Sequence, residues 1–304
     1  MRYLITLLLM ASVAGAQGVR NRTKTIVDGG HRYDYDTLGK RTTEPTGTYG
    51  SLVLKQTFSY SDNSDADFYD LSTSGNDGAQ GTAASQPTFS STFGGYYDFD
   101  GVDDYFTAAD ATSLDLTTAA SVFVWVNYLN AATSAGAVSK GDNDGSVNTL
   151  SYNLWPTTTG RFGVQISDTG ATADGKYYLA PSSTINTQEW HHIGFTYDAT
   201  TLKLYANGAR VADGGINKVF DGGVASINDS ALALQVGRFI ANGVGATYLE
   251  GDIDDVRIYD TALTAAQILA IADNTAATYY PYFSDFTESF DTYADLALWM
   301  PFTS

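Results

Sequence analysis

The stretch LKLYANGARV, residues 202–211, decides the fold class. Asn207-Gly208 is the dipeptide preferred in a type I′ hairpin turn, because both central residues of that turn need a positive φ angle. The short runs 202–206 and 209–211 on either side have the composition of strands. The stretch therefore predicts an antiparallel β-hairpin.

Other parts of the chain carry the same kind of signal. Phe162, Val164 and Ile166 alternate with polar or small residues, which predicts a half-exposed strand. The run VFVWV at 122–126 is apolar on both faces and predicts a central strand. From residue 51 onward, such runs are separated by clusters of Gly, Asp, Asn and Ser, the pattern of an antiparallel β-sandwich.

One helix is predicted near the C-terminal end of this region. Thr264 and Gln267 have the spacing of a capping box, and Leu263 and Ile268 have the spacing of a hydrophobic staple. We therefore expect a helix over about 265–272. One short helix leaves the all-β prediction unchanged.

Composition excludes several classes of function. The chain has 304 residues with 16 Lys and Arg against 34 Asp and Glu, a formal net charge of −18. Such an acidic surface repels phosphate backbones, so we expect no nucleic-acid partner. The absence of Cys excludes disulfides, thiolate metal sites and Cys nucleophiles. Three His (His31, His191 and His192) leave little for a zinc site or a catalytic triad.

The N-terminal residues 1–16 have the three parts of a secretory signal peptide. Arg2 is followed by an apolar run of about 11 residues and by the small residues Ala14-Gly15-Ala16. The run is too short to cross a bilayer, which takes roughly 20 residues. We therefore expect a secreted or cell-surface protein with no membrane span.

Charge divides the remaining chain into three parts. Residues 17–50 carry six Lys or Arg and four acids and predict a basic, turn-rich arm. Residues 51–273 contain the predicted sandwich. Residues 274–304 form an acidic tail with nine aromatic side chains and no Lys or Arg, too apolar for a disordered linker. Two alternatives stay open: the tail packs on its own domain, or residues 279–302 mediate self-association.

Seven segments in order resemble the laminin-G-like branch of the concanavalin A-like lectin/glucanase superfamily. They are DLSTSGNDG (70–78), YDFDGVDDY (97–105), SVFVWV (121–126), VSKGD (138–142), EWHHIGFTYD (189–198), LKLYANG (202–208) and GDIDDVRIY (251–259). The resemblance covers roughly residues 51–273. It implies an all-β fold, a two-sheet antiparallel jelly roll, with the predicted helix at its C-terminal end.

The resemblance also implies a structural calcium ion. Strict alternation along 253–259 places Asp254, Val256 and Ile258 on one face of a strand, so that Asp254 begins an apolar face. In relatives an Asp at this position helps to hold calcium, and Asp70 and Asp100 are its candidate partners. The alternative is that these residues cap turns through their carboxylates.

Glycan binding needs aromatic faces framed by polar groups. Trp155 precedes the loop-like sequence PTTTG, and Tyr177 and Tyr178 follow Asp174-Gly175-Lys176, so these three are the candidate exposed contacts. Asp142 and Asp144 lie in a loop that is either a plain turn or a calcium site at the ligand-binding rim. Trp125 and Trp190 are predicted core residues.

Glycoside hydrolysis is the other activity found in the superfamily that the sequence resembles. The glucanase branch carries two Glu in the pattern E-x-D-x-x-E, and no such Glu pair occurs here. The nearest string, Glu250-Gly-Asp252-Ile-Asp254-Asp255, lies in the predicted closing strand. The resemblance gives His191 and His192 structural roles, and no G-x-S-x-G motif occurs.

We therefore expect a secreted, non-catalytic module that binds a glycan or glycoprotein and holds structural calcium. The first alternative is a structural subunit of an extracellular filament, surface layer or virion, assembled through the N-terminal arm and the C-terminal tail. The second is a glycoside hydrolase that uses Glu250 and Asp252.

Overall fold

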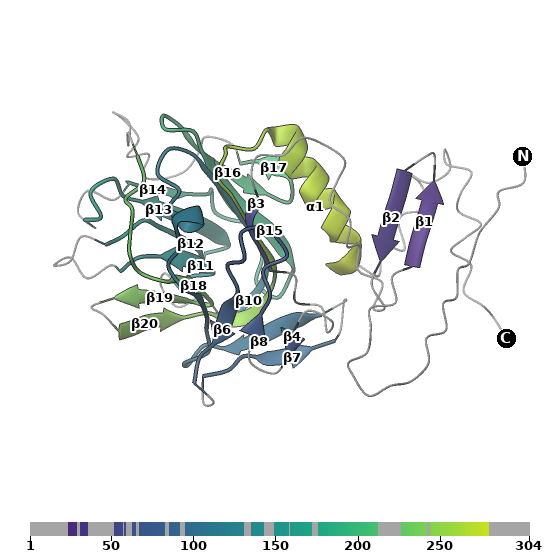
Figure 1. Cartoon of the computed structure of the whole chain (residues 1–304), viewed down its shortest axis with the longest axis horizontal. Helices are drawn as coiled ribbons and strands as arrows, with labels where there is room; N and C mark the ends of the chain where they lie inside the picture. Colours follow the sequence, from purple (N-terminus) through teal and green to yellow (C-terminus); the bar gives the residue numbers. More distant parts are fainter. Residues whose placement is uncertain are drawn as a thin grey trace, which may run out of the picture.

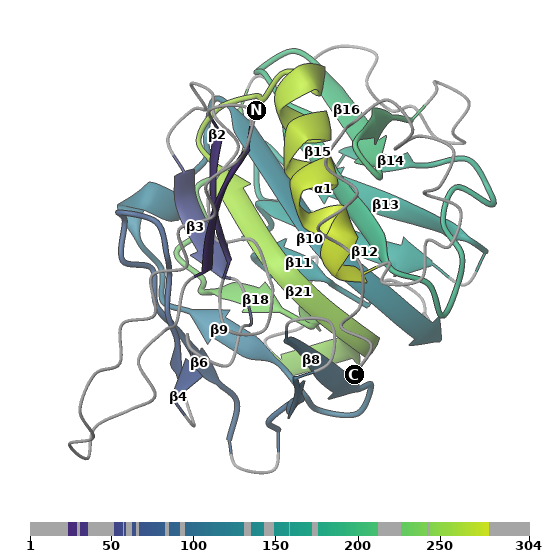
Figure 2. The ribbon, with the colours of Figure 1, turned by 90° about the vertical axis from the view of Figure 1, so that its right-hand side faces the viewer.

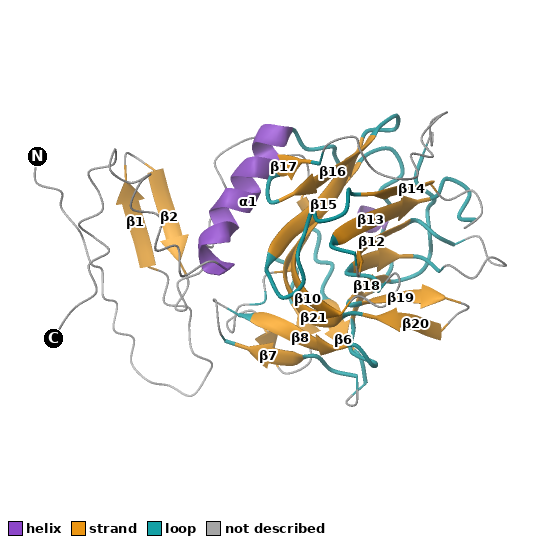
Figure 3. Cartoon of the chain, turned by 180° about the vertical axis from the view of Figure 1, so that it is seen from behind, coloured by secondary structure: helices purple, strands orange, loops and turns teal. Residues whose placement is uncertain are grey.

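Two antiparallel β-sheets pack face to face in the computed structural model of the chain (Figures 1 and 3). The structure describes residues 24–28, 31–35 and 52–279, apart from gaps at 57, 59–62, 65–66, 83–84, 92–94, 131–134, 143–148, 158, 172–175, 212–225 and 242–243. The predicted two-sheet jelly-roll class is confirmed.

The first sheet has eight strands in the order β17-β16-β15-β10-β21-β8-β7, and β3 pairs with the other end of β21. Their bounds are β3 Leu52–Gln56, β7 Thr88–Ser90, β8 Tyr96–Asp100, β10 Ala120–Asn130, β15 His191–Tyr197, β16 Leu202–Ala206, β17 Ala209–Arg210 and β21 Glu250–Tyr259.

The second sheet has nine strands in the order β14-β13-β12-β11-β18-β9-β6-β5-β4. Their bounds are β4 Asn63–Ser64, β5 Asp67–Phe68, β6 Gly78–Gln80, β9 Phe106–Ala108, β11 Val138–Lys140, β12 Tyr152–Thr157, β13 Arg161–Ile166, β14 Lys176–Leu179 and β18 Leu234–Val236. Two further strand pairs form separate two-stranded sheets. They are β1 Lys24–Asp28 with β2 His31–Tyr35, and β19 Arg238–Ala241 with β20 Val244–Tyr248.

The core lies between the two sheets and takes alternate residues from each. Val122, Val124 and Val126 of β10 point into it, while Phe123 and Trp125 lie on the opposite face of the first sheet. We call this opposite face, which points away from the core, the outer face of the sheet. From the second sheet, Val138, Leu154 and Val164 enter the same core in cross-strand register.

Local predictions for the first sheet are confirmed. β10 lies between β15 and β21, as expected of a central strand. The turn between β16 and β17 has φ angles of 50° at Asn207 and 78° at Gly208. Both positive values are those that a type I′ hairpin needs.

Helix α1 (Ala265–Tyr279) lies across the outer face of the first sheet (Figure 2). Its predicted capping box is present: Gln267 Nα donates to Thr264 Oγ1 over 3.3 Å, and Gln267 Oε1 accepts from Thr264 Nα over 2.8 Å. The predicted end near residue 272 is wrong, because the sequence has no Gly or Pro until Pro281. Ile268 and Ile271 pack against Phe123 and Tyr259.

A β-bulge in β21 contradicts the predicted strict alternation over 253–259. Asp255 has φ of 49°, and the pairing with β10 shifts so that Phe123 faces Arg257 while Trp125 faces Asp254. One extra residue in β21 reverses the alternation. Asp254 therefore lies opposite outer-face Trp125, rather than on the core face with Val256.

Some predictions concern parts of the chain outside the described residues. These are the signal peptide at 1–16, most of the basic arm at 17–50 and the tail from residue 280 onward. Within the arm, the structure adds the antiparallel pair β1 and β2. Among the described residues, no helix is long and apolar enough to cross a membrane.

Candidate functional site

A row of polar side chains crosses the outer face of the first sheet, beyond the region that α1 covers. Cross-strand register brings together Thr88 of β7, Asp98 of β8, Asp252 of β21 and Asn127 of β10. Directly paired residues of an antiparallel sheet point to the same side. We call these four residues the carboxylate row.

Two like charges stand opposite each other in this row. Burial, with a contribution from the Asp98 charge, raises the pKa of Asp252 to about 7, although a hydrogen bond from Asn127 opposes the shift. Partial burial and the charge of Asp100 also raise the pKa of Asp98, although the residue as a whole is exposed. Strongly perturbed carboxyl groups on an accessible surface are typical of functional sites.

Hydrogen bonding leaves part of the row available to a ligand. Asn127 Nδ2 donates to Asp252 Oδ2 over 2.8 Å, and Asn127 Oδ1 has no hydrogen-bond partner among the described residues. Asp98 is exposed at the surface. The row therefore offers carboxylate oxygens to a hydroxyl-rich molecule.

Aromatic side chains border the row on the same face. Tyr96, two residues before Asp98, is half-buried and packs edge-on against Trp190 with ring centroids 5.5 Å apart. Trp125, two residues before Asn127, completes this cluster. Trp125 and Trp190 are 1% and 5% exposed, so their predicted burial is confirmed, although they form a separate cluster on the outer face.

The predicted exposure of Trp155 is wrong. Trp155 lies within β12, and its indole lies over Gly163 of β13, where a Cβ atom would come within 2.5 Å of the ring. Only 8% of Trp155 is exposed. A glycine on the paired strand leaves room for the indole, and this contact between strands has no signal in the local sequence.

The other predicted ligand contacts are either buried or lie outside the described residues. Tyr178 is 7% exposed and belongs to the core, so its predicted exposure is wrong. Tyr177 lies in β14 opposite Gln165, but its side chain lies outside the described residues, as does Asp144. Asp142 is buried after β11 and bridges Ile240.

Asp70 does not fit a calcium ligand. Its two carboxylate oxygens accept four hydrogen bonds, from Lys55 Nα, Ser72 Nα, Ser72 Oγ and Asn76 Nα. A carboxylate has about four lone-pair positions, so these donors fill it. The turn-capping alternative describes Asp70.

The three predicted calcium ligands are not brought together. Asp254 is fully buried, and its Oδ1 accepts from Phe58 Nα and Asp255 Nα. Among the described residues, the acidic group close enough to share a cation is Asp100, Asp103 and Asp104, whose ligand oxygens lie within 4.8 Å of one another. Asp100 Oδ1 also accepts from Val102 Nα, as a turn cap would.

The two His residues next to Trp190 are structural. His191 Nε2 accepts a hydrogen bond from Asn186 Nα over 2.9 Å. His192 is buried and stacks on Phe123 with ring centroids 5.2 Å apart. These contacts agree with the structural role that the resemblance implied.

The fold and the ordered strand motifs define a lectin-like antiparallel sandwich. The profile of a family in the concanavalin A-like lectin/glucanases superfamily matches residues 100–269, and the chain belongs to this family. A search of curated proteins found no match.

Solved structures share this fold at low sequence identity. The binding domain of Paraclostridial Mosquitocidal Protein 1 has a TM-score of 0.53 and 14% identity over 73% of this chain and 52% of its own. The ligand binding domain of Botulinum neurotoxin serotype D, solved with N-acetylneuraminic acid, has a TM-score of 0.53 and 14% identity over 73% and 50%. This chain thus spans about half the length of these structures.

A third similar structure comes from work on botulinum neurotoxin type C, a toxin whose cell entry depends on interaction with two ganglioside molecules. It has a TM-score of 0.51 and 12% identity over 74% of this chain and 51% of its own. At these identities the likeness concerns the fold alone.

Proposed function

We propose that this protein is a secreted, non-catalytic module that binds glycans through the carboxylate row. Family membership supports a lectin-like role. One similar structure is a ligand binding domain in complex with N-acetylneuraminic acid, and another belongs to a toxin whose cell entry depends on gangliosides. Both descriptions favour a glycan as the ligand class. The signal-peptide pattern at 1–16 supports export.

The observation that carries the proposal is the register of Asp98, Asp252 and Asn127 beside Tyr96. Ionised carboxylates accept strong, charge-assisted hydrogen bonds from hydroxyl groups. The Asn127 amide donates to Asp252 Oδ2 and fixes that carboxyl group, and a Tyr ring offers an apolar surface for sugar C–H groups. Together these groups match the alternating polar and apolar edges of a sugar ring.

Charge favours neutral glycans. The chain carries a net charge of −18, and the row itself contains two acids. Anionic sugars would face like charges both nearby and over the whole surface. We therefore expect neutral oligosaccharides to bind better than sialylated ones.

A glycan array tests this proposal. We expect the wild-type protein to bind a subset of neutral glycans, and Asp98→Asn and Asp252→Asn to lose that signal. Asp260→Asn is the matched control, because Asp260 is an exposed acid just beyond β21. Absence of wild-type binding to every glycan, with and without Ca²⁺, would overturn the proposal.

A glycoside hydrolase is the second candidate, and the Asp252 and Asp98 pair favours it. Paired carboxyl groups with separated pKa values can serve as acid and base, and retaining enzymes place them about 5 Å apart. The test is release of reducing sugar from oligosaccharides that bind. Release that Asp252→Asn abolishes would support the hydrolase, and no release would remove it.

We propose calcium binding at Asp100, Asp103 and Asp104 rather than at the ligand set predicted from the sequence. Their oxygens are close together, and hard cations prefer carboxylate ligands. Asp100 pairs with Glu250 next to the carboxylate row, so an ion there would reduce the negative charge near the glycan site.

A further inference from the structure

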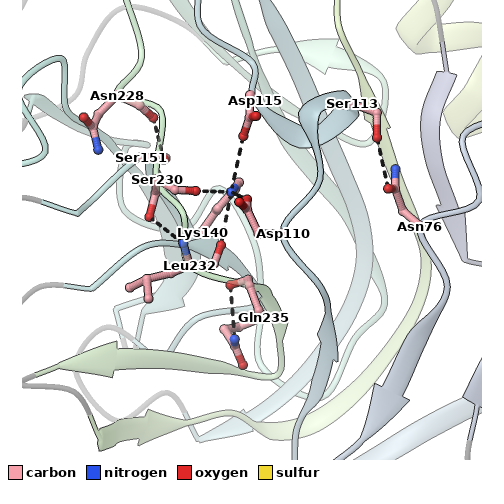
Figure 4. Close-up of polar contacts among 11 residues, drawn as sticks. Asn76, Asp110, Ser113, Asp115, Lys140, Ser151, Asn228, Ser230, Leu232 and Gln235 are labelled. Carbon is pink, nitrogen blue, oxygen red and sulfur yellow. Dashed lines mark hydrogen bonds and ion pairs between the residues drawn. The ribbon is translucent and has the colours of Figure 1, made fainter.

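Lys140 is buried at one end of the sandwich, far in sequence from most of its partners. The side chain is 1% exposed, and its Nζ donates to Asp110 Oδ1, to the carbonyl oxygen of Ser230 and, over 3.1 Å, to the carbonyl oxygen of Leu232 (Figure 4). These contacts use all three N–H donors of an ammonium group. Lys140 is therefore held in one position.

Asp110 Oδ1 lies 2.5 Å from Lys140 Nζ. Since a carboxyl C–O bond measures about 1.2 Å, the nitrogen lies no more than about 3.7 Å from the carboxyl carbon of Asp110. Near-attack geometries bring reacting atoms to about 3–3.5 Å. A small approach would thus place the Lys140 nitrogen within bonding reach of the Asp110 carbon.

A second carboxyl group stands beside the pair. Asp115 Oδ1 lies 3.6 Å from Lys140 Nζ (Figure 4). Burial and a hydrogen bond with the Asp229 carboxyl raise the pKa of Asp115, while the Lys140 charge opposes the shift. A carboxylate with a raised pKa is a better proton acceptor than an ordinary one.

The strands on either side of Lys140 place buried residues next to it. The cross-strand neighbours of Lys140 are Tyr152 and Leu234, 0% and 1% exposed. Separated charges cost more in such a place than in water. Asp110, by contrast, is 35% exposed, which gives a departing water molecule a route to solvent.

We propose that Lys140 and Asp110 form an intramolecular amide cross-link. Lys140 passes one proton to Asp110 Oδ1 along their hydrogen bond, the neutral amine attacks the carboxyl carbon of Asp110, and Asp115 accepts the second proton from the nitrogen. A C–N bond forms, one C–O bond breaks, and the oxygen leaves as water with the two protons lost from nitrogen. Overall, one ammonium and one carboxylate become one amide and one water, so no oxidant or cofactor is needed.

The bond would join two parts of the second sheet that are not neighbours. Asp110 follows β9, Lys140 ends β11, and β18 lies between these strands. The chain has no Cys and cannot form disulfides. An amide linking residues 30 positions apart would restrict the unfolded chain much as a disulfide does.

A tryptic digest of the denatured protein tests the proposal, because trypsin does not cleave after an amidated lysine. No Lys or Arg occurs between Lys55 and Lys140 or between Lys140 and Arg161. We expect one peptide spanning 56–161, lighter than its sequence by one water. Separate peptides 56–140 and 141–161 at full mass would overturn the proposal.

Lys203 is the internal control in the same digest. Its Nζ lies 3.7 Å from Asp198 Oδ2, with both side chains about one-third exposed. We expect normal cleavage there, giving the peptide 177–203 at full mass. Loss of water at this surface pair as well would show that the mass loss is nonspecific, and the proposal would fail.

Three variants assign the roles. Lys140→Arg keeps a cation without a primary amine, and Asp110→Ala removes the carboxyl group, so both should give normal cleavage at position 140. Asp115→Asn keeps both reacting groups and should lower the linked fraction. Complete linkage in Asp115→Asn would contradict the role given to Asp115. If the first two variants do not fold, the wild-type digest alone decides.

Discussion

Two ionisable residues on the outer face of the first sheet respond to pH in opposite directions. The pKa of Asp252 is raised to about 7, so the folded chain binds this proton more tightly than the unfolded chain does between roughly pH 4 and 7. Its contribution to stability therefore falls as pH rises through that window. Burial lowers the pKa of His192 to about 3, so its contribution falls as pH decreases below about 6.5.

Asp252→Asn should remove the loss of stability that Asp252 causes as pH rises. The neutral amide avoids repulsion by Asp98, so the Tm of the variant should rise relative to wild type as pH increases from about 4 to 8. Thermal melts over this range provide the measurement. Asp260→Asn should show no such trend, and parallel curves for Asp252→Asn and wild type would contradict the prediction.

His192→Phe should reduce sensitivity to acid. Both ring nitrogens of His192 have no hydrogen-bond partner among the described residues, and the ring already stacks on Phe123. An apolar ring of similar size should change the free energy of unfolding little at pH 7. As pH falls toward 3, the variant should become increasingly more stable than the wild type. Denaturant unfolding at several pH values measures this.

His191→Phe is the matched control for that substitution. His191 accepts a hydrogen bond from Asn186 Nα, so the substitution removes a partly buried hydrogen bond and should cost about 0.5–1.5 kcal/mol at pH 7. Equal effects of the two substitutions at pH 7 would contradict the different hydrogen bonding of the two rings.

At the scale of elements, the hairpin β16–β17 supports helix α1. Gly208 has φ of +78°, and a Cβ atom there would lie 2.9 Å from Leu269 Cδ1 and 3.1 Å from Ala272 Cβ. The same glycine thus satisfies the turn and admits the helix. Its first role follows from the sequence, whereas its second appears only in the fold.

Gly208→Ala should therefore destabilise the protein for two reasons. A left-handed backbone costs a non-glycine residue roughly 1–2 kcal/mol, and the contacts with α1 add to this. Gly75→Ala is the control, since Gly75 has φ of +70° with no atom within 4 Å. Urea unfolding should show a larger loss for Gly208→Ala, and equal losses would contradict the contact with α1.

Signals confined to one element were predictable from the sequence. The Asn207-Gly208 turn, the cap at Thr264 and the central strand β10 all depend on neighbouring residues. The bulge at Asp255 depends on pairing with β10, and the burial of Trp155 depends on Gly163 of the next strand. The carboxylate row was missed for the same reason, since register across four strands assembles it.

At the scale of the whole molecule, the excess of acidic residues lowers the stability of the folded state through charge repulsion. If Asp100, Asp103 and Asp104 hold calcium, the ion removes repulsion that the folded state otherwise carries. The Tm should rise with Ca²⁺ concentration and fall after treatment with EDTA. Asp103→Asn should weaken the response, and identical melts of the wild type with Ca²⁺ and with EDTA would contradict the proposal.

Lectin-like folds serve many purposes, so function depends on the site rather than on the sandwich. The most direct test is the affinity of the strongest neutral glycan from the array, measured by calorimetry for the wild type, Asp98→Asn/Asp252→Asn and Asp260→Asn. Loss of charge-assisted hydrogen bonds should weaken binding by the double variant about 10-fold or more, with Asp260→Asn unchanged. Equal affinity of the double variant and the wild type would contradict glycan binding at the carboxylate row.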